Sequence, residues 1–137
     1  MEVFDNIPID LTLEAVLKRM HVRNKNESIV KNVQEMLEMA RPVAKPKAIY
    51  DVVYVENKNG DSVEIGGVKF TSRVLRVNLD KVESVFPYVV TCGREIDEMD
   101  IPPQDLMKCY FMDQIKETVV VLAREYLGEY LKEKCDC

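Results

Sequence analysis

The stretch that decides the fold is YVVTCGREIDEM, residues 88–99. Its β-branched start predicts a strand, and Thr91, Cys92 and Gly93 at its end predict a sharp turn into a charged segment. Ends of strands are where folds commonly place backbone that contacts ligands. The stretch therefore predicts a buried strand and a candidate binding site where that strand stops.

An apolar-striped segment follows this stretch, after a Pro102-Pro103 break. Its apolar residues keep three- and four-residue spacing to about residue 134, which is typical of a helix. The run Val119-Val-Val-Leu122 alone suits a buried strand, but the sustained spacing favours a helix even though Gly128 costs it about 1 kcal/mol. An apolar arc this wide needs cover on most sides, so we expect the helix to pack across a sheet or between partners.

The remaining patterns complete a mixed fold. Asn59-Gly60 and Gly66-Gly67 are turn signals that join neighbouring strands into an antiparallel set. Ahead of residue 88 we expect an edge strand within 2–9, a helix opened by Asp10 or Thr12, a second helix from Ser28 to near Pro42, and a short helix capped by Thr71 or Ser72. We expect strands near 49–56, 62–70 and 85–91 in one sheet, and a helix over most of 105–133. The fold class is α+β: a twisted, largely antiparallel sheet with helices packed beside it and a long C-terminal helix.

Composition limits the classes of protein to which the chain can belong. Its 137 residues suit a single domain, 1–137, with a core of its own. The net charge of −5 argues against a nucleic-acid surface, because phosphate binding needs a concentrated basic face. No apolar window is long enough for a transmembrane helix, and the N-terminus lacks the pattern of a secretory signal. We expect a cytoplasmic protein with neither nucleic acid nor membrane as partner.

The cysteines do not predict a metal site. Cys92 and Cys109 lie among apolar residues and are interpreted as small buried thiols. Cys135 and Cys137 form a Cys-x-Cys pair, but a structural site needs about four ligands and the one histidine, His21, is far away in the sequence. A frayed tail is the simpler interpretation of the pair, so no metal ligand is assigned.

No catalytic constellation stands in the chain. Glycine-rich dinucleotide and phosphate loops are absent, and a triad would depend on His21, for which solvent exposure in a basic linker is favoured. The acidic run Glu95, Asp97, Glu98 and Asp100 fits a carboxylate cluster for a cation or for acid–base work, but a solvated helix face is favoured over that reading. No catalytic residue is predicted.

The candidate site is therefore the strand end itself. Gly93 permits a close backbone approach, Thr91 and Cys92 add a hydroxyl and a thiol, and Glu95 frames the edge. These four residues are the predicted cofactor- or ligand-contacting positions. The competing interpretation, which is favoured, is that Gly93 only makes the turn and Cys92 belongs to the core.

Short runs along nearly the whole chain resemble the small proteins related to the activation domain of cobalamin-dependent (vitamin B12-dependent) methionine synthase. The runs are VLKRM (16–20), PKAIY (46–50), VEIGGVKF (63–70), TCG (91–93) ahead of Glu95-Ile96-Asp97, and MDQ (112–114). Those relatives often carry Thr-x-Gly at the point held here by Thr91-Cys92-Gly93. The resemblance implies an α+β scaffold that, in the full activation domain, binds S-adenosylmethionine and meets the cobalamin-carrying domain during reductive remethylation of the cofactor.

The chain departs from that family at its end. The family's S-adenosylmethionine signature, Arg-x-x-Pro-Ala-x-Gly-Tyr-Pro, lies C-terminal to the long helix, and this sequence stops at Cys137. Either the chain is a truncated piece of a longer protein, or it is a relative that has lost the site. We expect this chain alone to bind S-adenosylmethionine weakly or not at all, so no cofactor is assigned to it. The cobalamin that the family implies would be carried by a partner.

Two hypotheses of function follow. The first is an accessory, activation-type module that supports corrinoid-dependent methyl transfer or cofactor reactivation by docking to a corrinoid protein or methyltransferase. The second is a non-catalytic oligomerising α+β domain without a ligand, whose long C-terminal helix forms a homodimer. An enzyme in its own right ranks third, because no catalytic constellation is found.

Overall fold

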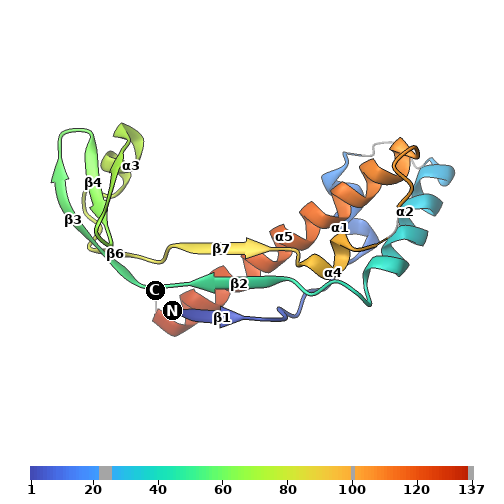
Figure 1. Ribbon diagram of the computed structural model, residues 1–137, viewed down its shortest axis with the longest axis horizontal. Helices are drawn as coiled ribbons and strands as arrows, with labels where there is room; N and C mark the ends of the chain where they lie inside the picture. The colour runs from blue at the N-terminus through green and yellow to red at the C-terminus, as the bar shows by residue number, and fades with distance from the viewer. Residues whose placement is uncertain (22–25, 100, 136–137) are drawn as a thin grey trace. The chain divides into compact units, whose positions relative to one another are not determined.

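The computed structural model describes residues 1–21, 26–99 and 101–135, and it has the predicted α+β class (Figure 1). The elements in chain order are β1 (Glu2–Phe4), α1 (Leu13–Arg19), α2 (Glu27–Ala40), β2 (Lys47–Tyr50), β3 (Val53–Asn59), β4 (Ser62–Ile65), β5 (Val68–Thr71), α3 (Arg73–Asn78), β6 (Ser84–Val85), β7 (Tyr88–Thr91), α4 (Arg94–Asp97) and α5 (Leu106–Cys135).

Contacts along the chain divide it into two compact units. The sheet unit comprises Met1–Val3 and Ile49–Val89, and the helical unit comprises Phe4–Ala48 and Val90–Cys137. The boundaries fall inside β1, β2 and β7, so each of these strands has residues in both units. The expectation of one domain over 1–137 stays a prediction.

The strands of the described residues form two sheets, where the sequence predicted one. Their orders are β1-β2-β7 and β5-β4-β3-β6. The predicted strand 49–56 is broken at Asp51, whose carboxylate accepts a hydrogen bond of 2.8 Å from the Val52 N–H. The predicted strand 85–91 is broken at Pro87, which has no N–H to donate to a strand ladder. Each break lets one half of an apparently continuous strand join a different sheet.

The helical unit is built on packing among α1, α2 and α5, which lie together in Figure 1. The Thr12 side chain caps α1 by accepting a hydrogen bond of 3.2 Å from the Ala15 N–H, as predicted. The Asn26 side chain caps α2 two residues before the predicted start at Ser28. Fully buried residues such as Val16, Val33 and Leu37 fill the space between these helices.

The long helix α5 confirms the prediction of a helix over most of 105–133. The alternative strand at 119–122 is not formed, since these residues lie inside the helix. Its buried apolar positions follow helical spacing: Phe111, Met112, Ile115, Val119, Ala123 and Leu127. One face of this helix therefore contributes Phe111, Met112, Ile115 and Val119 to the core of the helical unit.

In the sheet unit, β3, β4 and β5 form an antiparallel meander, β6 pairs with the other side of β3, and α3 lies beside β4 (Figure 1). Gly66 and Gly67 form the predicted turn between β4 and β5, with φ of 58° and 84°, and positive φ at both central residues defines a type I′ hairpin turn. The Ser72 side chain caps α3. Cross-strand pairs put Val63 and Phe70 on the same face of the sheet, and also Ile65 and Val68. We call this face, on which Val63 is fully buried, the inner face.

Candidate functional site at the end of β7

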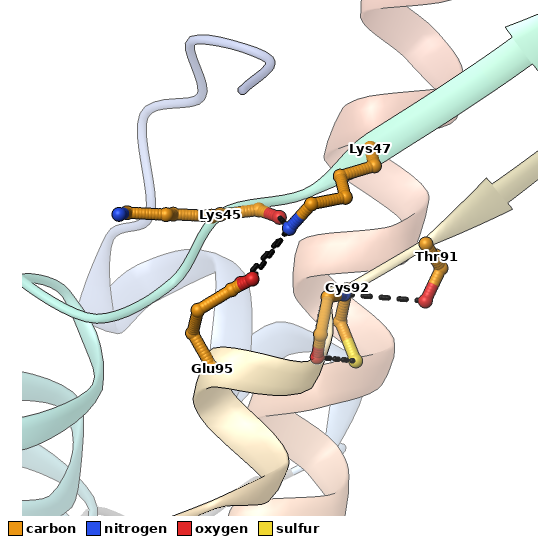
Figure 2. A network of polar contacts seen from close by, with 6 residues as sticks. Lys45, Lys47, Thr91, Cys92 and Glu95 are labelled. Carbon is orange, nitrogen blue, oxygen red and sulfur yellow. Dashed lines mark hydrogen bonds and ion pairs between the residues drawn. The ribbon is translucent and has the colours of Figure 1, made fainter. Parts of the chain in front are cut away.

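The predicted site lies inside the helical unit, where β7 ends and α4 begins (Figure 2). Gly93 is buried and is the N-cap residue of α4, with φ of 88° and ψ of 157°. A Cβ atom on Gly93 would collide with the carbonyl oxygen of Lys45, a backbone atom that cannot swing away. The close approach that the sequence predicted for a ligand is thus made by another segment of the chain.

Thr91 stabilises the same turn. Its hydroxyl accepts a hydrogen bond of 3.2 Å from the Gly93 N–H, and the side chain is otherwise exposed. Short side chains that bond the backbone two residues on are typical of turns. The Thr91 hydroxyl is therefore partly committed to the turn while its exposed side stays open to a ligand.

Cys92 is half-buried against the core of the helical unit. Burial, and secondarily the negative charge of Asp97, raises the pKa of this thiol above its ordinary value of 9.0. A thiol with a raised pKa carries little thiolate at neutral pH and is a poor nucleophile or metal ligand. The chemistry of Cys92 matches that of a small apolar side chain more closely than that of a reactive cysteine.

Glu95 is held by a lysine from β2. The two carboxylate oxygens of Glu95 lie 2.6 and 2.8 Å from Lys47 Nζ, which also donates to the Lys45 carbonyl oxygen at 3.1 Å (Figure 2). The hydrogen bond from Lys47 holds the pKa of Glu95 below its usual range. This pair ties α4 to β2 and leaves the Glu95 carboxylate largely neutralised by its own neighbour.

The structure thus brings all four predicted residues together around one turn. It adds Lys45 and Lys47, which the sequence analysis did not single out, because they lie more than forty residues earlier in the chain. The PKAIY run (46–50) contained a signal for Lys47. A lysine at the start of one strand is able to reach the end of a neighbouring strand. The ligand-contacting role of Thr91, Cys92, Gly93 and Glu95 stays a prediction.

Among the described residues of the acidic run, the remaining carboxylates do not converge on a cation site. Asp97 makes an ion pair of 2.8 Å with Lys116 of α5, Glu98 is exposed, and Asp100 lies outside the described residues. Within residues 1–21, 26–99 and 101–135, no group of three or more histidine, cysteine or acidic side chains could hold a metal ion. The Cys135 and Cys137 thiols lie outside the side chains that the structure describes.

The helical unit has a groove of about 710 Å³ between α1 and α5. Arg19 and Glu117 form an ion pair of 2.8 Å there, and exposed His21, with φ of 55°, lies at the end of α1. The groove contains His21, the one histidine of the chain. Its exposure to solvent agrees with the prediction from the sequence. The groove does not place a serine or cysteine nucleophile beside His21 among the described residues that line it.

Among the helices in the described part of the chain, none combines the length and the hydropathy that crossing a membrane needs. The net charge of −5 provides no basic excess for a nucleic-acid surface.

No protein-family model matches this chain, and no curated protein matches it.

Proposed function

We propose that this chain is a docking module without catalytic residues of its own, and that it supports corrinoid-dependent methyl transfer by binding a corrinoid protein or methyltransferase. The partner class rests on the resemblance of the short runs named above to activation-domain relatives of methionine synthase. The docking role rests on an exposed apolar patch at the start of α5, in the helical unit. In this role the cofactors would perform the methyl-transfer chemistry, and the chain would supply binding and positioning.

The observation that carries the docking role is an apolar patch on the first turns of α5, formed by Leu106, Met107 and Tyr110. The three positions fall within one side of the helix, and Leu106 is 78% exposed, Met107 56% and Tyr110 48%. Large apolar side chains gathered on a surface mark interaction sites more often than side chains scattered singly. We call these three residues the α5 patch.

Calorimetry provides the direct test. A corrinoid protein loaded with its cofactor is titrated into the full chain and into a Leu106→Ser/Tyr110→Ser double variant. We expect saturable binding to the unaltered chain and at least tenfold weaker binding to the double variant, which corresponds to about 1.4 kcal/mol. Glu129→Ser, on an exposed position near the other end of the same helix, is the matched control and is expected to change nothing.

The outcomes separate the partner from the surface. Absence of binding by any corrinoid protein or corrinoid methyltransferase tested would contradict the partner class. Equal binding by the double variant would show that the α5 patch is not the docking surface. S-adenosylmethionine is titrated in parallel, and saturable binding with a dissociation constant of about 10 μM would contradict the expectation that this chain lacks the site.

The second candidate is an oligomerising domain, in which α5 joins two copies of the chain. The same α5 patch favours it, because an exposed apolar helix face is equally suited to a second copy. Light scattering on the chain alone distinguishes the two roles. A dimer that the Leu106→Ser/Tyr110→Ser variant dissociates would support oligomerisation through α5, whereas a dimer that this variant leaves intact would contradict it.

A further inference from the structure

The outer edge of β5 presents backbone groups without a neighbouring strand. Among the strands that the structure describes, β5 is the last in the order β5-β4-β3-β6, and all four of its residues are exposed. Its pairing with β4 runs from Val68 to Thr71 without a bulge, and it contains no proline. Bulges and prolines are among the devices by which proteins blunt such edges, and β5 has neither.

The register shows which backbone groups point outward. A two-residue hairpin turn is closed by a hydrogen-bonded pair, here Ile65 and Val68, and hydrogen-bonded pairs then alternate along the ladder. The bond of 2.8 Å from the Ser72 N–H to the Asp61 carbonyl oxygen fits the same alternation. The N–H and C=O groups of Lys69 and Thr71 therefore point away from β4, toward the free edge.

The inner face also runs out to this edge without full cover. Val63 on β4 is 0% exposed, but its cross-strand partner Phe70 on β5 is 42% exposed, and Val68 is 56% exposed. The apolar surface that buries Val63 thus continues past β4 to the edge. A further strand beside β5 would extend the sheet and cover these two side chains.

We infer that two copies of this chain pair through β5, antiparallel, about a two-fold axis at Phe70. In that register the Lys69 and Thr71 backbone groups of each copy bond those of the other, giving four hydrogen bonds across the axis. The two Phe70 rings meet as a non-hydrogen-bonded pair, the arrangement in which cross-strand side chains lie closest. The result is one continuous sheet of two meanders.

Charge favours a second copy at this register. Each Lys69 lies opposite Thr71 of the other copy, so the two lysines do not face each other. Within each copy Lys69 is the cross-strand partner of Glu64, which sets opposite charges side by side. A sequence that places one apolar residue on the axis and a lysine beside a threonine is complementary to itself, as a two-fold interface requires.

The first test removes the outward N–H alone. Thr71→Pro deletes the donor on the edge, where proline is tolerated because it breaks no bond to β4, and Thr71→Val keeps the N–H as its matched control. Sedimentation of the full chain between about 10 μM and about 1 mM is expected to show a dimer for the unaltered chain and for Thr71→Val, weakened about tenfold or more in Thr71→Pro. Circular dichroism verifies that each variant is folded.

The second test locates the axis. Phe70→Cys places two thiols opposite each other at a distance that a disulfide spans, whereas Val68→Cys places its two thiols far apart. We expect peptide mapping after mild oxidation to show a bridge between residue 70 of both copies, and no bridge between the two copies of residue 68. Mapping also separates these bridges from any formed by the native cysteines.

Several results would overturn the inference. They are a monomer at every concentration, a dimer equally strong in Thr71→Pro and Thr71→Val, or bridging at residue 68 instead of residue 70. Binding of an extended peptide by a monomeric chain would also overturn it, because the edge would then serve another partner. The α5 patch is untouched by these variants, so failure here and failure of corrinoid-protein docking are separate findings.

Discussion

At the scale of single residues, Gly93 has the largest expected effect on folding. Its φ of 88° disfavours any side chain, and a Cβ would collide with the Lys45 carbonyl oxygen. We expect Gly93→Ala to lower the free energy of unfolding by about 1–3 kcal/mol. Gly128→Ala is the matched control, because its Cβ meets nothing within 4 Å, and a gain of about 0.5–1 kcal/mol is expected there. Denaturant unfolding measures both.

The same position decides whether the strand end contacts a ligand. In Gly93→Val, binding of a corrinoid protein should fall only in proportion to the folded fraction if the glycine is structural. Loss of binding with little change in melting temperature would instead support ligand contact at Thr91, Cys92, Gly93 and Glu95. The sequence predicted the turn correctly from a β-branched run followed by glycine. It could not predict the Lys45 carbonyl beside it, since that contact depends on how distant segments pack.

Cys92 should make stability depend on alkaline pH. Because burial raises the pKa of the folded thiol above 9.0, the neutral form is favoured in the folded protein. Its contribution to stability is complete below about pH 9 and is lost as the pH rises through the folded pKa. Melting temperatures between about pH 8 and about pH 10 should therefore fall more steeply for the unaltered chain than for Cys92→Ala. Parallel curves for the two proteins would contradict this expectation.

At the scale of elements, α5 is the helix on which the core of the helical unit depends. Ile115 is fully buried in that core, so Ile115→Ala should lower the free energy of unfolding by about 2–5 kcal/mol. Leu106→Ala, on the exposed α5 patch of the same helix, is expected to change it by less than about 0.5 kcal/mol. Equal losses of unfolding free energy in the two variants would mean that the Leu106 side chain is buried in solution. Denaturant unfolding at one pH compares the two.

Elements were predicted well where one pattern extended over many residues and poorly where a single residue interrupts a strand. The helical spacing from Tyr110 to Tyr130 was sufficient to predict α5. The division of 49–56 and 85–91 into separate strands depended on Asp51 and Pro87, and its effect on sheet membership is a property of pairing between distant segments. Pro87 was a visible signal, because proline rarely lies inside a paired strand.

At the scale of the whole molecule, the two units differ in how much they bury. In the described part of the chain, the sheet unit contributes Tyr50 and Val63 to the buried hydrophobic residues, and the helical unit contributes the others. Regions with few buried apolar contacts open more readily. We expect amide hydrogens of β3, β4 and β5 to exchange faster than those of α2 and the middle of α5. Uniform protection across both units, measured by hydrogen exchange, would contradict this.

The late position of α5 in the chain has a consequence for biosynthesis. The ribosome releases α1 and α2 first, and about 65 further residues must be added before α5 begins. At roughly 5–20 residues per second, the apolar faces of the two early helices wait several seconds for the helix that covers them. During translation these faces are open to chaperones and to neighbouring nascent chains, so the helical unit depends on cellular protection most while it is still being made.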